Sequence, residues 1–350
     1  MHRKSCSPEA TSAAGSWHTN GAPGRFRSAR QWLRGCAVAA AALCTVPAQA
    51  ADFPSKPVTM IVPYPAGGAT DVVARAVAEK LGGAWRQSVI VENRAGAGTT
   101  IGAGTVARAS GDGYTLYMTT SAHTISGHIY AKLNYDPVKD FAPITLVTKV
   151  PLVLVINPAV PAGNLQEFLA YLKQKSASVN FASPGNGTAQ HLSGELFKIA
   201  TQSSITHVPY RGDAPAFTDL VGGQVQMMLA TITSALPLIQ SGKLRALAVA
   251  NGTRVPALSQ VPTFAEAGMP GFEAATWFGL LAPASTPAAL TQRIHDDVAA
   301  IVDTPAMRKR IEDLGGEVVN STPQAFAAFM DAEQRKWGEA VRASGMAINQ

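Results

Sequence analysis

The chain has 350 residues and a formal net charge of +6, and most of that charge lies near the N-terminus. Residues 1–50 hold six of the 29 Lys and Arg residues and one of the 23 Asp and Glu residues, so the remainder has 23 basic against 22 acidic residues and a net charge of +1. A nearly neutral remainder gives no reason to expect a nucleic-acid partner, because proteins bind nucleic acids through clustered positive charge.

The first 50 residues predict a secretory signal peptide. Basic residues between Arg25 and Arg34 precede an apolar run over residues 36–44, and the segment ends in Ala48-Gln49-Ala50. The run is well short of the roughly 20 residues that a membrane span needs, so we expect cleavage between Ala50 and Ala51. Every cysteine of the chain lies in this segment: Cys6, Cys36 and Cys44. The exported chain would therefore have no disulfide, no thiolate metal site and no cysteine nucleophile.

Beyond residue 50, strand-like runs alternate with helix-like ones, a pattern typical of an α/β fold with largely parallel sheets. Strands are expected over residues 58–62, 88–91, 115–119, 152–156, 179–182, 226–230 and 244–250. Helices are expected over residues 70–81, 165–174, 187–200, 214–222, 287–301, 306–314 and 323–343.

The order of these elements predicts two domains. Near Pro151 the chain passes from one series of alternating elements to another, and near Trp277 an apolar stretch leads back into a purely helical tail. We expect a discontinuous first domain, 51–151 plus 277–350, and an inserted second domain, 152–276. About 300 residues suit two domains, each held by a hydrophobic core.

Two glycine loops, residues 63–68 and 183–188, each lie between an expected strand and an expected helix. At a helix N-terminus the first backbone N–H groups have no partner within the helix and the macrodipole is positive, so an acidic group is attracted there. Gly67 and Gly68 would let a ligand approach closely. Two such loops could hold one ligand from both ends, although glycine is also ordinary turn chemistry.

Polar residues after other strands are further candidates. Thr120, Ser121 and His123 follow a strand of the first domain, so we expect them to line a cleft. Tyr210 and Asp213 follow a strand of the second domain and could close the cleft from that side. Surface turns would explain these positions equally well.

Several motifs together resemble one family. They are Ile-Val-Pro-Tyr-Pro-Ala-Gly-Gly over 61–68 with Asp71, Val-Glu-Asn-Arg over 91–94, Gly-Asp-Gly-Tyr-Thr-Leu over 111–116, residues 136–143, Gly-Asn-Gly-Thr over 185–188 with residues 191–197, His-Val-Pro-Tyr over 207–210, and residues 242–249. In this order they resemble the Bug substrate-binding proteins, the periplasmic components of tripartite tricarboxylate transporters. The resemblance runs from about Phe53 to the C-terminus.

The resemblance implies a two-domain periplasmic binding-protein fold, type II-like, that closes as a Venus flytrap on a small di- or tricarboxylate or related acid. It implies that the loop from Tyr64 to Asp71 holds carboxylate groups, with Ala66, Gly67 and Gly68 donating from the backbone. The second loop would serve the other end of the cleft through its own residues: Ser183, Gly185, Gly187 and Thr188. Membrane components of the transporter would be the partners.

Two residues near the loops have competing interpretations. Asp71 caps its helix or fixes a bridging water, and capping is favoured because Asp in the first turn suits the dipole. His191 lies one turn into the second helix, where it contacts ligand or bonds a backbone carbonyl; no second histidine or carboxylate stands at metal spacing. Many relatives carry an acid where Ala230 stands, and its absence here favours a ligand without an amine.

Other functions fit less well. Residues 96–102 loosely resemble a dinucleotide-binding turn, but no acidic residue ends the next strand to hold a ribose, so no cofactor is expected. Hydrolase motifs and paired metal ligands are absent from the sequence, so neither catalysis nor a metal site is expected. A signalling role, in which a sensor kinase reads the closed form, shares the same physical event and stays open.

Overall fold

The computed structural model describes residues 16, 18, 20, 53–130 and 132–344. The expected apolar run, the cleavage site and all three cysteines lie outside the described residues. The chain divides into two units, residues 1–51 and residues 52–350, and the fold below is that of the second.

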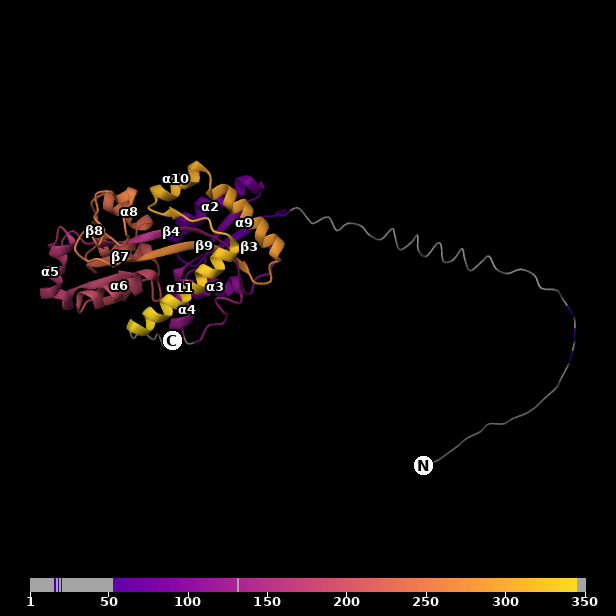
Figure 1. Cartoon of the computed structure of the whole chain (residues 1–350), viewed down its shortest axis with the longest axis horizontal. Helices are drawn as coiled ribbons and strands as arrows, with labels where there is room; N and C mark the ends of the chain where they lie inside the picture. The colour runs from indigo at the N-terminus through magenta and orange to yellow at the C-terminus, as the bar shows by residue number, and fades with distance from the viewer. Residues whose placement is uncertain (1–15, 17, 19, 21–52, 131, 345–350) are drawn as a thin grey trace, which may run out of the picture. The chain divides into compact units, whose positions relative to one another are not determined.

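The strands join in one hydrogen-bonded order, β2-β1-β3-β9-β4-β7-β5-β6, with β8 and β10 also pairing with β4. Their bounds are β1 Val58–Val62, β2 Val89–Asn93, β3 Thr115–Thr120, β4 Phe141–Ile156, β5 Asn180–Ser183, β6 Thr206–Pro209, β7 Met227–Thr231, β8 Arg245–Val249, β9 Ala275–Pro283 and β10 Glu317–Val318. Figure 1 shows β4 and β9 as the long strands of this unit.

The strands form a mixed sheet, so the expectation of largely parallel sheets is wrong. The pairs β1–β2, β1–β3, β5–β6 and β5–β7 are parallel, whereas β9 and β4 are antiparallel to their neighbours. The physical reason is the route of the chain: β4 and β9 each lead from one set of parallel strands to the other, and they run in opposite directions.

β4 divides the strands into two groups. Its residues Phe141–Pro151 pair with β9, as far as Pro151 opposite Ala275. From Leu152 onward it pairs with β7 and β8 instead. We call β1, β2, β3, β9 and β10 the first strand group and β5, β6, β7 and β8 the second. The expected strand over 152–156 is only the last part of β4. The first part of β4 contains Pro143 and Pro151 and has register shifts against β9, so its sequence lacks a regular strand pattern.

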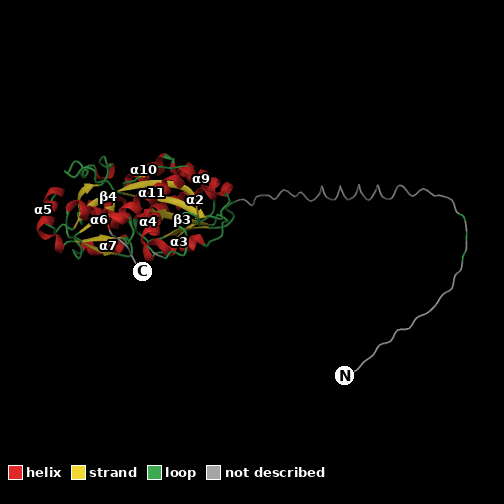
Figure 2. Ribbon diagram, turned by 60° about the horizontal axis from the view of Figure 1, so that its bottom comes forward, coloured by secondary structure: helices red, strands yellow, loops and turns green. Residues whose placement is uncertain are grey.

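Helices connect the strands and cover the sheet (Figure 2). They are α2 Ala69–Trp85, α3 Thr100–Ala107, α4 Ser121–Ile129, α5 Leu165–Lys175, α6 Ala189–Thr201, α7 Asp213–Val221, α8 Ile232–Gln240, α9 Ala288–Val302, α10 Pro305–Asp313 and α11 Pro323–Ser344, with single 3₁₀ turns at Ala97–Thr99, Ser176–Ser178 and Pro256–Leu258. The described helices include none with the length and hydropathy of a membrane span.

Three helices have no counterpart among the expected ones: α3, α4 and α8. Their sequences are rich in Gly, Ser, Thr and Ile, and α8 contains Pro237, so their intrinsic helix propensity is low. Tertiary burial stabilises them, since Ala103, Ile125 and Leu236 all lie in the core. Helix α2 likewise extends through Gly82 to Trp85, whose indole donates to Asp297 at 2.7 Å.

A buried carboxylate ties α11 to β9. Glu333 is 8% exposed, and one of its oxygens accepts from the indole nitrogens of Trp277, at 2.9 Å, and Trp337, at 2.7 Å. The ring of Phe326 packs edge-on against Trp277 with centroids 5.6 Å apart. This cluster fixes the start of β9, which leads to the functional site.

We predict that Glu333→Gln destabilises the fold by about 1–3 kcal/mol, because an amide cannot accept from both indoles as strongly as a carboxylate. Urea unfolding of the exported chain would measure the change. Glu339→Gln on the exposed face of α11 is the matched control and should stay within about 0.5 kcal/mol of the unmodified chain. Equal effects of the two substitutions would contradict the proposed role of Glu333.

Candidate functional site

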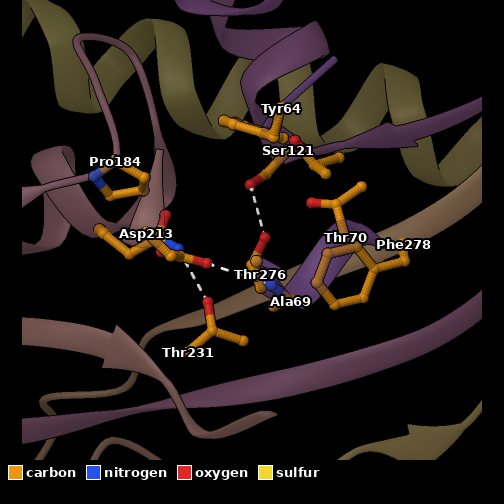
Figure 3. A pocket seen from close by; sticks show the side chains of 12 residues that line it. Tyr64, Ala69, Thr70, Ser121, Pro184, Asp213, Thr231, Thr276 and Phe278 are labelled. Carbon is orange, nitrogen blue, oxygen red and sulfur yellow. Dashed lines mark hydrogen bonds between the residues drawn. The ribbon is translucent and has the colours of Figure 1, made fainter. Parts of the chain in front are cut away.

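A small polar cavity lies where the two strand groups meet. From the first group it is lined by Tyr64 and Gly68, the start of α2, Thr120 at the end of β3, Ser121 at the start of α4, and two residues of β9. The second group contributes four side chains, Pro184, Gln190, Asp213 and Thr231 (Figure 3). We call this the inner cavity. Its volume is about 10 Å³, enough for about one water molecule.

The N-terminus of α2 opens into the inner cavity. Gly68 is its N-cap with φ −80°, and no side chain of the helix's own first turn caps it. The Ala69 N–H donates instead to Oδ2 of Asp213, at 3.2 Å, from the other strand group. A carboxylate of the protein itself thus lies at the helix N-terminus where the sequence predicts an anion site.

Asp213 is buried, with 8% of its surface exposed, and its Oδ1 has no hydrogen-bond partner among the described residues. Burial raises the pKa of Asp213, and the Ala69 N–H and the nearby Ser234 hydroxyl oppose that rise only in part. The α7 N-terminus that carries Asp213 approaches the first loop closely: a Cβ at Gly212, which has φ +110°, would lie 2.7 Å from Cδ of Pro65. Only glycine fits there.

The first loop is braced from outside the cavity. Asp71 accepts from the Gly67 N–H at 3.0 Å, from Asn93 at 2.9 Å and from Arg75 at 2.9 Å. Burial would raise the pKa of Asp71, but these hydrogen bonds outweigh it and lower the pKa below its ordinary value. Asp71 thus holds the loop that precedes α2, through the Gly67 N–H, and does not accept from the backbone N–H groups of the helix itself. The resemblance implied backbone donors at Ala66, Gly67 and Gly68. Ala66 and Gly67 are exposed, and the Gly67 N–H already donates to Asp71, so of these three residues Gly68 alone lines the inner cavity.

Hydroxyl groups line the rest of the inner cavity. The Ser121 hydroxyl lies 3.1 Å from that of Thr276, and Gln190 Nε2 donates to Thr231 Oγ1 at 2.8 Å. The Thr120 hydroxyl accepts from the Ala122 N–H as the cap of α4. Ser121 has another hydroxyl as its partner rather than a histidine or a carboxylate, so it lacks the neighbouring base that activates a serine nucleophile.

The second loop satisfies its own hydrogen bonds. Ser183 Oγ donates to the Gly185 carbonyl at 3.1 Å and lies 2.7 Å from His207 Nε2. Thr188 caps α6 by accepting from the His191 N–H, and its own hydroxyl donates to the Gly185 carbonyl at 2.8 Å. The Gly187 N–H donates to His191 Nδ1 at 3.2 Å. These residues shape the loop, whereas Pro184 within it and Gln190 just after it line the inner cavity.

Two histidines stack beneath the second loop. The rings of His191 and His207 lie 3.8 Å apart with an interplanar angle of 15°. Burial lowers the pKa of His191 to about 4, and burial together with the neighbouring His191 and Lys198 lowers the pKa of His207 to about 3. Both rings are therefore neutral at neutral pH, and the stack supports the hydrogen bonds of Ser183 and Gly187.

An outer cavity of about 180 Å³ adjoins the inner one, and Tyr64 and Pro184 line both. Its other walls are Pro63 and Pro65 of the first loop, residues 95–99, Tyr130 and the loops 185–186 and 209–212. Gly185 and Tyr210 lie here. The Tyr210 hydroxyl donates to Asp219 at 2.7 Å, and burial with that carboxylate raises the pKa of Tyr210 to about 12.

The expectation that His123 lines the cleft is wrong. Its side chain is 0% exposed, its Nε2 lies 2.7 Å from the Pro137 carbonyl, and burial lowers its pKa to about 4. α4 carries it away from the cavity because it follows Thr120 and Ser121 on a helix, not on an extended loop. Within residues 53–130 and 132–344, no group of three or more His, Cys, Asp or Glu side chains has the arrangement of a metal site.

Sequence reasoning missed part of the inner cavity: Ala69, Thr70, Pro184, Gln190, Thr231, Thr276 and Phe278. A usable signal was present in two cases. Thr231 and Thr276 are polar residues in otherwise apolar strands, and both are buried. A buried polar residue at the end of an apolar strand needs a partner, so it marks a candidate site.

The sequence matches a known family. Residues 73–346 fit the profile described as the tripartite tricarboxylate transporter family receptor. Among known relatives, protein BugT of Bordetella pertussis is 36% identical over 301 residues, which cover 85% of this chain and 92% of BugT.

Solved structures agree. A protein from R. palustris, solved with adipate, has a TM-score of 0.83 and 34% identity, covering 85% of this chain and 99% of that one. The periplasmic binding protein BugD has a TM-score of 0.81 and 36% identity over 85% of this chain and all of BugD. MatC from Rhodopseudomonas palustris, with bound malate, has a TM-score of 0.78 and 35% identity over 83% of this chain and all of MatC. The fold class expected from the sequence, a two-domain α/β periplasmic binding protein, is confirmed.

The histidine stack predicts how stability depends on pH. Because His191 and His207 bind protons less readily in the folded chain than in the unfolded one, their contribution is complete above the unfolded pKa of about 6.5 and is lost as the pH falls toward 4 and then 3. We expect a loss of at least about 2 kcal/mol between pH 7.5 and pH 5 in guanidinium unfolding.

Two variants check the origin of this loss. His207→Asn should make the pH dependence shallower, whereas His128→Asn, at an exposed position on α4, should leave it unchanged. A pH dependence identical in all three proteins would show that the stack is not its source.

Proposed function

This chain belongs to the family of tripartite tricarboxylate transporter receptors, as its motifs indicated, and we propose that it captures a small carboxylate in the periplasm and delivers it to the membrane components of such a transporter. The observation that carries the proposal is the N-terminus of α2, which presents the backbone of Gly68 and Ala69 to a polar cavity between the strand groups. Relatives of the same fold were solved with adipate and with malate.

Energetics support a carboxylate as the ligand. A hydrogen bond to a charged acceptor contributes about 1.5–3 kcal/mol, so two or three of them distinguish an acid from its amide. The hydroxyls of Ser121 and Thr276 lie on the same cavity wall and add neutral donors. Both loops are hydrogen-bonded internally, so little ordering entropy opposes binding.

We propose separate roles for the residues singled out from the sequence. Those that line the inner cavity contact the ligand: Tyr64, Gly68, Thr120, Ser121 and Asp213. Those that line only the outer cavity, Gly185 and Tyr210, border its entrance, and Ala66 and Gly67 lie on the exposed rim of the first loop. The remainder hold the loops in shape: Asp71, Ser183, Gly187, Thr188 and His191.

We further propose the domain boundaries expected above, residues 51–151 plus 277–350 and residues 152–276. The pairing of β4 supports them, since it changes partner between Pro151 and Leu152, and β9 leaves the junction at Ala275. The inner cavity holds about one water in this conformation, so a dicarboxylate enters when the two domains separate and is enclosed when they close.

Export of the chain completes the proposal. Residues 1–50 would act as a signal peptide and leave the protein in the periplasm, where the receptors of this family capture their ligands. The sensor-kinase alternative has no support among the similar proteins named above.

Thermal unfolding of residues 51–350 against a panel of carboxylates tests the proposal. A ligand at 100 times its dissociation constant stabilises the folded state by about 2.7 kcal/mol, which raises the midpoint by several degrees. We expect such a shift with a subset of mono-, di- and tricarboxylates and none with their amides. No shift with any acid, in folded protein freed of ligand, would contradict carboxylate capture.

A pair of variants locates the binding site. In Gly68→Val the new Cβ would lie 3.2 Å from Asp213 Oδ2 and fill the inner cavity, so affinity should fall at least about tenfold. Gly83→Val, on the exposed end of the same helix with no atom within 4 Å of its Cβ, should bind as the unmodified chain does. Unchanged binding in Gly68→Val would remove the α2 N-terminus from the site.

A further inference from the structure

We propose that Asp213 determines specificity by accepting a hydrogen bond from an ammonium or hydroxyl group that the ligand carries close to its carboxylate. The inference rests on the proposed function, because it assumes that the ligand's carboxylate binds at the N-terminus of α2. It adds a requirement that carboxylate capture alone does not make.

The first support is the condition of the Asp213 carboxylate. It is 8% exposed, Oδ2 is held by the Ala69 N–H, and Oδ1 is buried in the inner cavity without a partner. The described residues place no lysine or arginine against it. Buried carboxylates are ordinarily paired with a cation or satisfied by several hydrogen-bond donors. In Asp213 one oxygen has such a donor and the other has none. Figure 3 shows it facing the cavity between Pro184 and Thr231.

The second support is that no side chain of the described residues donates to Oδ1, because those nearby have other partners. The two hydroxyls opposite, Ser121 and Thr276, are paired with each other at 3.1 Å. Gln190 donates to Thr231, and the Ser234 hydroxyl donates to the Thr231 carbonyl at 3.2 Å. A donor group on a bound ligand would supply the partner that Asp213 Oδ1 lacks.

The third support is the distance between Asp213 and the anion site. The Cβ position of Gly68 lies 3.2 Å from Asp213 Oδ2, and Ala69 is its donor, so a ligand carboxylate at this N-terminus comes within a few ångströms of Asp213. Two carboxylates that close repel each other strongly in a cavity with little water. A donor on the ligand, placed between the two carboxylates, converts the repulsion into a hydrogen bond on each side.

Asp213 also changes what Ala230 implies. The absence of an acid at position 230 favoured a ligand without an amine. Ala230 is itself buried in β7, next to Thr231, and Asp213 supplies a carboxylate to the cavity that Thr231 lines. An amine or a hydroxyl thus has an acceptor in this cavity, from α7 instead of β7.

Isothermal titration of residues 51–350 at pH 7.5 with two matched series tests the inference. One series is succinate, malate and aspartate, and the other is glutarate, 2-hydroxyglutarate and glutamate, each being an acid without a donor, with a hydroxyl and with an ammonium group. We expect the best donor-bearing acid to bind at least about tenfold tighter than its plain counterpart. The tighter of the hydroxy and amino acids identifies the donor.

Asp213→Asn is the decisive variant. Its side-chain oxygen can still accept from the Ala69 N–H, but its charge and one acceptor are gone, so the plain acid should bind more tightly, the amino or hydroxy acid more weakly, and the preference should largely disappear. Asp331→Asn, the same change at an exposed position on α11, should preserve the preference. Thermal midpoints of both variants would show that each is folded.

Two outcomes would overturn the inference. The first leaves the proposed function standing, and the second removes it as well. Equal binding of all members of a series by the unmodified chain, or an equal effect of Asp213→Asn on each of them, removes Asp213 as a specificity residue and leaves carboxylate capture intact. No binding of any of the six acids, with no response to the wider panel of carboxylates, removes the proposed function together with the inference.

Discussion

The hydrogen bond between the Ala69 N–H and Asp213 is the contact on which the site depends, because it joins the N-terminus of α2 to the N-terminus of α7 across the two strand groups. The first turn of any helix leaves backbone donors without partners, and burying them requires an acceptor. Gly68 has no side chain to supply one, so the acceptor comes from a residue 144 positions away. In the function proposed above, the same N-terminus attracts the carboxylate of the ligand, so folding and binding would use one structural feature.

The long strands β4 and β9 place the two halves of the site. Each pairs within the first strand group, and β4 then continues into the second, so the positions of Thr276, Thr231 and Thr120 follow from one continuous ladder. A ladder of backbone hydrogen bonds resists sliding, because a slip of one residue turns every side chain to the opposite face. The opening and closing proposed above would take place at the junction near Pro151, where β4 changes its partner.

The two glycine loops owe their shape to residues that never face the cavity. Asp71 braces the first loop through Gly67, and Ser183, Thr188 and the stacked histidines brace the second. These residue types are common in ligand contacts, but here their hydrogen bonds hold the loops in shape. Polar side chains near a turn satisfy the backbone of that turn first, since an unsatisfied buried N–H or carbonyl is costly. The groups that remain for the proposed ligand are backbone groups, hydroxyls and Asp213.

The sequence by itself determined the family, the alternation of strands and helices, and the two loops, because these depend on local periodicity and on glycine at helix starts. It correctly placed β1 and the start of α5, both of which have strong local patterns. It could not place α4, the first part of β4, or His123, whose conformations come from tertiary burial that overrides weak local propensity. Nor could it show that Asp213 lies against Ala69, because only the folded chain brings residues so distant in sequence into hydrogen-bond distance.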